Sequence, residues 1–158
     1  TVGNDMNFLT MGCWAQKHSD AGSLVTLFMG GNGIGGGMVI NGRLWTGASG
    51  YCSEVGFLPV YERLNKGSLG LPPAEHISEL YARLIQVYAV TVNPHMMVLY
   101  RHPLLEGRLD EIRRLCASYL PSKAIPSIEL SYDYQQDYEK GLFTVAKSMG
   151  QAVSEGGL

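Results

Sequence analysis

The residues with the clearest chemical potential form a glycine-rich segment, Gly30 to Gly37, in which six of the eight residues are glycine. Because glycine lacks a Cβ atom, its backbone N–H group can come close to an anion, and successive amides can form an anion-binding nest. A phosphate group is therefore a sensible ligand for a loop of this composition. A tight glycine turn that binds nothing is the open alternative.

The run from Gly31 to Gly36 also satisfies the dinucleotide-binding pattern GxGxxG. That pattern requires a strand before the glycines and a helix after them, so that the helix N-terminus holds the pyrophosphate. Here Met38 to Ile40 and Arg43 to Trp45 flank Asn41-Gly42, a strong signal for a type I′ hairpin. We therefore expect a glycine loop that joins two strands, and no nicotinamide cofactor.

The elements that must position this loop follow from apolar periodicity and from glycine and proline signals. An N-terminal helix is followed by the order β-β-β-α-β-α-β-α, which is the order of the ribonuclease-H-like unit of the actin and hexokinase ATPases, an α/β fold. In the final helix, we expect Leu142, Val145 and Met149 to face inward. Besides the hairpin strands, the predicted elements are helices over Asn4–Lys17, Pro72–Val92, Arg108–Tyr119 and Asp137–Met149, and strands over Leu24–Met29, Met96–Tyr100 and Ile125–Leu130.

Composition narrows the class of protein. The 158 residues suffice for one compact domain. The formal net charge is −2 and no five like charges are adjacent, so neither nucleic acid nor an anionic membrane has an electrostatic footprint on this segment. The three cysteines form no CxxC pair and the four histidines lack ligand spacing, which predicts no metal site. Such cysteines are typical of a reducing cytoplasm.

Three motifs, in order, resemble the ROK family of sugar kinases and sugar-responsive repressors. Asn4 to Asn7 is similar to its NDxN motif, and Gly31 to Gly37 is similar to its second phosphate loop, GTGIGxG. The stretch from Asn41 to Gly56, with NGR, GASG and EVG, resembles NGRLYRGAxGxAGEIGH. The tail also fits, since Asn93 to Leu99 resembles a strand entry of the family and Asp137 to Ala146 resembles its closing helix.

The resemblance implies specific roles. Asp5 would be the catalytic base of a kinase, kept ionised by the helix dipole. Asn4, Asp5 and Glu54 would bind sugar hydroxyls. ATP and Mg²⁺ would be the cofactors of such a kinase. The residues implied in phosphate binding are Gly31, Asn32, Gly33 and Gly35. These residues are expected to line one cleft.

The sequence departs from the family pattern at several places. Phe57 stands where a sugar-binding His is usual, and a phenyl ring makes no hydrogen bond to a hydroxyl. The segment from Tyr61 to Gly70 has none of the cysteines of the usual zinc loop, so zinc is not expected. Leu99-Tyr100-Arg101 replaces a Leu-Gly-Gly that approaches the adenosine, and we expect the two larger side chains to crowd that surface.

We therefore interpret residues 1–158 as the C-terminal lobe of a longer ROK protein whose other lobe precedes it. The first hypothesis is a sugar-responsive transcriptional regulator, which would contact DNA only through an upstream helix-turn-helix. The second is an ATP-dependent sugar kinase, of which the isolated lobe would be inactive. The third is a degenerate scaffold or dimerisation domain. The expected partners are a monosaccharide and, from the resemblance alone, further copies of the protein.

Overall fold

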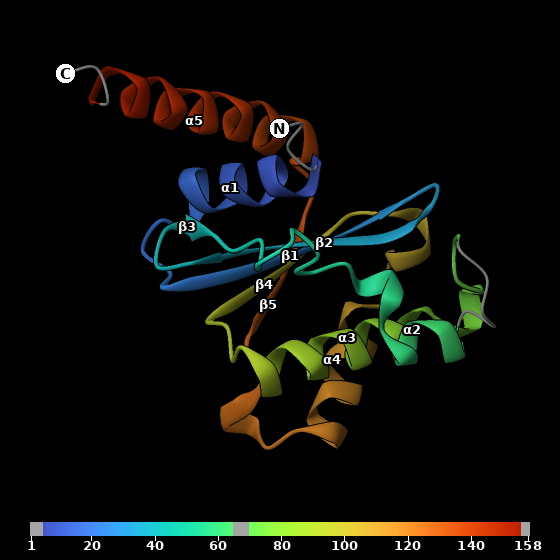
Figure 1. Ribbon diagram of the computed structural model, residues 1–158. Coiled ribbons are helices and arrows are strands. Elements are labelled where there is room, and N and C mark those ends of the chain that lie inside the picture. The colour runs from blue at the N-terminus through green and yellow to red at the C-terminus, as the bar shows by residue number, and fades with distance from the viewer. Residues whose placement is uncertain (1–4, 65–69, 156–158) are drawn as a thin grey trace.

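The computed structural model describes residues 5–64 and 70–155, and the side chains of 152–155 are left aside. A five-stranded sheet, in the order β3-β2-β1-β4-β5, lies between two layers of helices (Figure 1). The pairs β1–β4 and β4–β5 are parallel, and β1–β2 and β2–β3 are antiparallel. The strands are β1 (Ser23–Gly30), β2 (Gly33–Ile40), β3 (Arg43–Leu44), β4 (Met96–Tyr100) and β5 (Ser127–Ser131).

One face of the sheet carries α1 and α5, and the other carries α2, α3 and α4 (Figure 1). The predicted order of elements is present, with α2 as an additional short helix that was not among the predicted elements. The α-helices are α1 (Asp5–Lys17), α2 (Pro59–Leu64), α3 (Ile77–Thr91), α4 (Leu109–Tyr119) and α5 (Tyr134–Glu155). The 3₁₀-helices are η1 (Val55–Phe57), η2 (Ala74–His76), η3 (Pro103–Leu105) and η4 (Ser122–Ala124).

Strand β1 is buried on both faces because it lies at the centre of the sheet. Val25 and Leu27 point into the larger core under α3, whereas Leu24 points into the smaller core under α1. Successive side chains of a strand point to opposite faces, so a continuous apolar run suits this central position. The predicted strand over Leu24–Met29 is confirmed and is one residue longer at each end.

The glycine-rich segment is mostly strand, which corrects our expectation of a loop from Gly30 to Gly37. Only residues 31 and 32 form the turn, and β2 begins at Gly33. A Cβ atom on Gly35 would clash with Met6 of α1, and one on Gly37 would clash with Thr10 of the same helix. These glycines therefore let α1 lie close against β2, and this contact outweighs the weak strand propensity of glycine.

The hairpin between β2 and β3 confirms the predicted type I′ turn. Asn41 and Gly42 have φ angles of 50° and 74°, in the left-handed region that this turn requires at both positions. Ile40 pairs with Arg43 across the turn.

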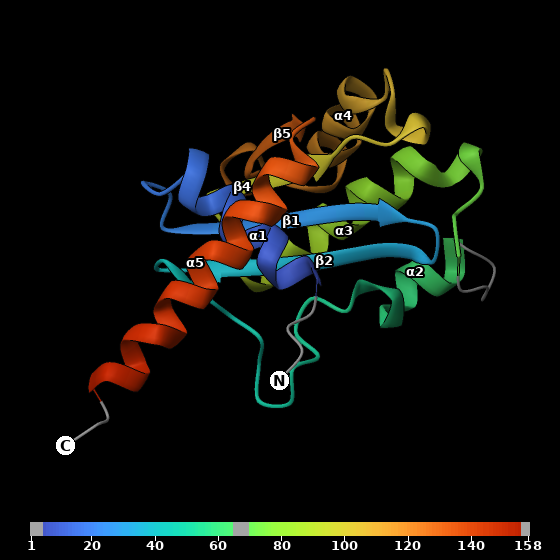
Figure 2. The ribbon, with the colours of Figure 1, turned by 90° about the horizontal axis from the view of Figure 1, so that it is seen from above.

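The helices α1 and α5 cross at two glycines. A Cβ atom on Gly12 would coincide with the backbone carbonyl of Asp137, and one on Gly141 would coincide with that of Phe8. The two backbones therefore touch without intervening side chains, and α5 lies directly across α1 (Figure 2). The position of α1 on the sheet is thus determined from both sides.

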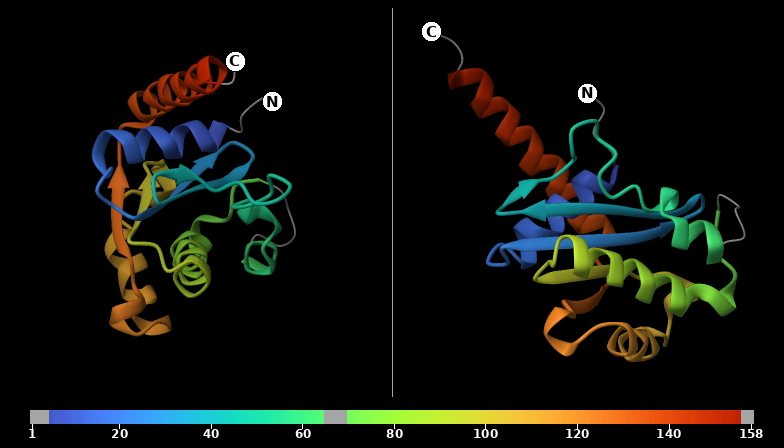
Figure 3. Two further views of the ribbon diagram at one scale, coloured as in Figure 1. Left: turned by 60° about the vertical axis from the view of Figure 1, so that its left-hand side comes forward. Right: turned by 60° about the horizontal axis from the view of Figure 1, so that its bottom comes forward.

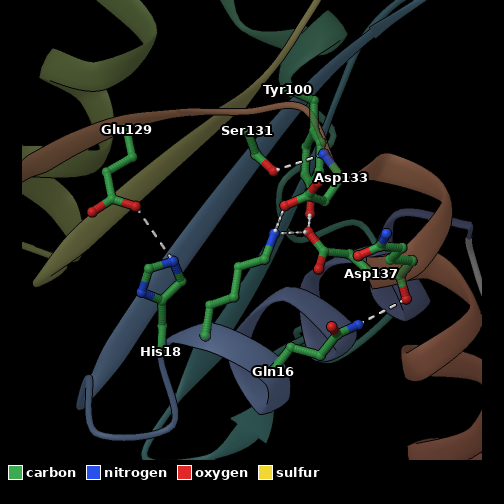
Figure 4. A network of polar contacts seen from close by, with 9 residues as sticks. Gln16, His18, Tyr100, Glu129, Ser131, Asp133 and Asp137 are labelled. Atoms are coloured by element: carbon green, nitrogen blue, oxygen red, sulfur yellow. Dashed lines mark hydrogen bonds and ion pairs between the residues drawn. The ribbon is translucent and has the colours of Figure 1, made fainter.

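A polar network secures the same crossing (Figure 4). Asp137, fully buried on α5, accepts hydrogen bonds through Oδ2 from the Tyr100 hydroxyl at 2.6 Å and from Lys17 Nζ at 3.3 Å. Lys17 Nζ also donates to Asp133 Oδ2 at 2.7 Å. Burial of a carboxylate requires such partners, so the network holds the end of α1, the end of β4 and the start of α5 together.

The final helix differs from its prediction. It begins at Tyr134 rather than Asp137 and continues to Glu155. Leu142 and Met149 are exposed, so the prediction that they face inward is wrong. The C-terminal half of α5 extends past the sheet, where no described element covers it (Figure 3). The prediction failed because periodicity marks an apolar face but does not show what packs against it.

Candidate active site

Asp5 begins α1 and is exposed to solvent. The N-terminus of a helix favours negative charge, so this end of α1 is a suitable position for a carboxylate. The hydroxyl of Tyr138, on α5, donates a hydrogen bond to Asp5 Oδ1 at 3.3 Å. Asn4, the predicted sugar ligand next to it, lies outside the described residues.

Of the four residues implied in phosphate binding, Gly31 and Asn32 form the turn between β1 and β2, and Gly33 and Gly35 lie in β2. Gly31 and Asn32 are exposed at the tip of the turn, and a Cβ atom on Gly31 would meet nothing within 4 Å. Gly33 has a φ angle of +117°, which an L side chain rarely adopts. The turn thus presents open backbone to solvent, as an anion-binding turn requires.

Tyr61 of α2 supports this turn from below. The Ile34 amide donates a hydrogen bond to the Tyr61 hydroxyl at 3.3 Å, and that hydroxyl donates to the Gly70 carbonyl at 2.8 Å. The amide of Ile34 is therefore already hydrogen-bonded. No sequence signal singled out Tyr61.

Asp5 and the glycine turn line one hollow of about 300 Å³. The start of α1 and the adjoining ends of β1 and β2 contribute to its wall. Its lining includes the four residues implied in phosphate binding, Gly31, Asn32, Gly33 and Gly35, together with Asp5. The close packing of α1 on β2 brings them together. A carboxylate and a turn with open backbone therefore lie next to each other, in a hollow whose size suits a phosphate group beside a sugar hydroxyl.

Aromatic rings that sequence reasoning missed form one wall of this hollow. Phe28 and Tyr134 line it, with their ring centroids 4.6 Å apart. Tyr134 stacks on Tyr138, whose ring lies 6.1 Å away and nearly parallel. The spacing of the two tyrosines, four residues apart on a helix, places them on one face and could have indicated this wall.

Glu54 lies elsewhere. It is half-buried in the segment after β3 and lines a separate hollow of about 220 Å³ between that segment and α3. Among the described residues it therefore does not share a hollow with Asp5, contrary to the single cleft that we expected.

The Leu99-Tyr100-Arg101 segment departs from its prediction in one respect. Tyr100 is 1% exposed and points under α5, so it does not crowd the surface at the end of β4. Its burial, with the neighbouring Cys13 and Asp137, raises the pKa of its hydroxyl far above the usual range. Arg101 is exposed, pairs with Glu106 at 3.3 Å, and lies 5.5 Å over the ring of Tyr132.

Among the residues that the structure describes, no group of three or more His, Cys, Asp or Glu side chains could hold a metal ion. Within the same residues, none of the helices combines the length and apolar character needed to cross a bilayer.

A sequence model of the ROK family matches residues 1–73, which include the turn and both candidate carboxylates. No curated protein sequence gives a significant match to the chain. Among solved structures, a ROK hexokinase from Thermus thermophilus is similar, with a TM-score of 0.62, 16% identity, and coverage of 92% of this chain and 65% of its own.

Two more solved structures share the fold. A ROK family protein from Streptococcus pneumoniae TIGR4, in complex with sucrose, has a TM-score of 0.66 and 16% identity over 94% of this chain and 66% of its own. A protein from Listeria monocytogenes, whose name proposes an N-acetylmannosamine kinase, has a TM-score of 0.63 and 19% identity over 87% and 62%.

This chain thus spans slightly less than two thirds of the length of each of these structures. At such identities the likeness establishes the fold, and the predicted ribonuclease-H-like, actin-like ATPase architecture is confirmed. The predicted resemblance to the ROK family is confirmed as well, by sequence over residues 1–73 and by fold over nearly the whole chain.

Proposed function

We propose that residues 1–158 form the C-terminal, sugar-binding lobe of a longer ROK protein, and that this lobe serves in ATP-dependent phosphorylation of a sugar hydroxyl. The observation that carries the proposal is the shared hollow of Asp5 and the glycine turn. The neighbouring structures agree with it, since one is a hexokinase and another holds sucrose.

In this proposal, the Asp5 side chain, at the start of α1, accepts the proton of the attacking sugar hydroxyl. The amides at Gly31 and Asn32 bind the phosphate oxygens, which is mainly positioning and charge stabilisation. ATP with Mg²⁺ would supply the phosphoryl group. Glu54, from its own hollow, binds other hydroxyls of the sugar.

Our first hypothesis from the sequence, a sugar-responsive regulator, becomes the second candidate. It was favoured by an adenosine side crowded by Tyr100 and Arg101 and by the absence of the zinc motif. Of the two side chains, Tyr100 is buried, whereas Arg101 is exposed. One specific observation still supports it. Phe57 is 76% exposed beside Glu54, where a hydrogen-bonding His is usual in the resemblance, and a protein that only senses a sugar can lose such a contact.

The full-length protein carrying this lobe distinguishes the candidates. We expect turnover with ATP and one sugar of a panel of hexoses, pentoses and amino sugars. Asp5→Asn should lower kcat at least about 100-fold while the sugar still raises Tm, because a general base acts in the chemical step. Asp20→Asn, an exposed loop aspartate away from the hollow, is the matched control.

Other outcomes decide between the remaining hypotheses. Sugar binding by the wild-type protein without any turnover would contradict the kinase and select the regulator. No change in Tm with any sugar at millimolar concentration would contradict both and leave the scaffold. Joint loss of binding and turnover in Asp5→Asn would contradict the assignment of Asp5 as the base.

A further inference from the structure

The hollow that Glu54 lines has a mainly apolar wall. It lies between the segment 51–58, the end of α3 and the middle of β2, and its volume is about 220 Å³. Its apolar lining consists of Met38, Val55, Leu58, Val87 and Val92. A hydroxyl-rich sugar ring alone would gain little from such a wall, which instead favours an apolar group.

Tyr88 supplies a buried hydroxyl at the wall of this hollow, which the polar residues Ser53, Glu54 and Thr91 also line. Its side chain is 6% exposed, and its hydroxyl has no hydrogen-bond partner among the described residues. Burial raises the pKa of Tyr88 to about 12, although the nearby Ser53 side chain acts in the opposite direction, so the group remains an O–H donor near neutral pH. An unpaired buried donor is costly, and a ligand that offers an acceptor would relieve it.

Gly36 explains why this hydroxyl fits under the sheet. A Cβ atom on Gly36 would come within 2.9 Å of the Tyr88 hydroxyl and 2.8 Å of the Ser53 carbonyl. The glycine therefore leaves the space in which both groups lie. The glycines of β2 thus leave space on both faces of the strand, for α1 on one face and for this hollow on the other.

Two exposed rings lie near the carboxylate of Glu54. Tyr51 and Glu54 line the hollow, whereas Phe57 lies outside its lining. The amides of Glu54 and Phe57 donate to the carbonyls of Tyr51 and Glu54 at 3.3 and 3.1 Å. The rings of Tyr51 and Phe57, 69% and 76% exposed, lie 6.2 Å apart.

We propose that this hollow is a subsite for an aromatic or branched alkyl group attached to the sugar through an acceptor atom, as in an aryl glycoside. This deepens the proposed function and rests on it. Glu54 binds sugar hydroxyls at the mouth, the apolar group enters the hollow, and the Tyr88 hydroxyl donates to the linking oxygen. A cavity of about 150 Å³ holds benzene, so the volume here admits a phenyl ring and its linking atom.

The test uses the full-length protein and matched pairs of ligands. Glucose, mannose, galactose and N-acetylglucosamine are each compared with both of their phenyl glycosides by titration calorimetry. For the sugar that binds, we expect one phenyl glycoside to bind at least about tenfold more tightly, since burial of a ring contributes this much.

Two variants locate the effect. Tyr88→Phe keeps the shape of the hollow and removes only its hydroxyl, and it should weaken the phenyl glycoside about fivefold while the free sugar is unchanged. Val92→Phe should fill the hollow and abolish the preference. Val90→Phe is the control, because Val90 is 67% exposed on the same helix and does not line the hollow.

The outcomes separate this inference from the proposed function. Equal affinities for a sugar and both of its phenyl glycosides would overturn the subsite and leave sugar binding intact. A preference that survives both Tyr88→Phe and Val92→Phe would place the ring on Tyr51 and Phe57 outside the hollow, and would also overturn it. Failure of every free sugar and every glycoside to bind would refute the proposed function itself.

Discussion

The crossing of α1 and α5 gives a quantitative test of the fold that carries Asp5. Gly12→Ala would introduce a methyl group where the Asp137 carbonyl lies, and a backbone carbonyl cannot move aside as a flexible side chain does. Overpacking of this kind costs typically 1–3 kcal/mol, and a contact between two backbones belongs at the upper end. Alanine recovers about 1 kcal/mol of helix propensity. We therefore expect a net loss of about 2 kcal/mol in the free energy of unfolding.

Two comparisons make this expectation specific. Gly150 lies in α5, and a Cβ atom added there would meet nothing within 4 Å. Gly150→Ala should therefore stabilise the chain by about 0.5–1 kcal/mol. In the double variant with Gly141→Ala, the helices have already separated, so the combined loss should be smaller than the sum of the two single losses.

Urea unfolding followed by circular dichroism measures all four variants. The midpoint and slope together give the free energy of unfolding for each. A Gly12→Ala variant that is as stable as the wild type, or one that gains stability as Gly150→Ala does, would refute the direct contact of the two helices. Strict additivity in the double variant would refute the coupling.

Two further predictions concern the polar network at the same crossing. Lys17→Met should lower the free energy of unfolding by about 2 kcal/mol in urea melts, because it leaves the buried Asp137 carboxylate without its cation. The control is Lys147→Met, on the exposed side of α5, which should change the free energy of unfolding by less than about 0.5 kcal/mol. Burial raises the pKa of Cys13 from 9.0 to about 12, so the native state favours the neutral thiol. The resulting contribution to the free energy of unfolding is complete below about pH 9 and is lost as the pH rises towards 12. At pH 10 the loss should be on the order of 1 kcal/mol, measured as the difference in pH dependence of stability between the wild type and Cys13→Ala. An identical loss of stability at alkaline pH in both proteins would contradict this prediction.

Much of the secondary structure follows from the sequence. The strand from Met96 to Tyr100 has its predicted bounds, and the Asn41-Gly42 turn has its predicted type. Short apolar runs and the left-handed preference of Asn-Gly are local properties, so one sequence suffices to recognise them. The start of α5 at Tyr134 was missed, because the polar residues before Asp137 join the helix without adding to an apolar stripe.

The glycine run shows where local reasoning ended. Its composition indicated an anion-binding loop, yet most of it is strand, because only glycine permits α1 on one face and the Ser53 and Tyr88 groups on the other. Strand propensity is a weak local preference, and packing across the sheet overrides it.

What the sequence by itself determined was the order of elements, the family resemblance and the identity of the candidate groups, because these depend on residue types and their spacing along the chain. The tertiary structure alone decided which groups meet. It places Asp5 in one hollow with the glycine turn, gives Glu54 a different hollow closed by Tyr88, and turns Tyr100 inward to Asp137. Such juxtapositions arise from the packing of segments far apart in the chain, and no local pattern encodes them.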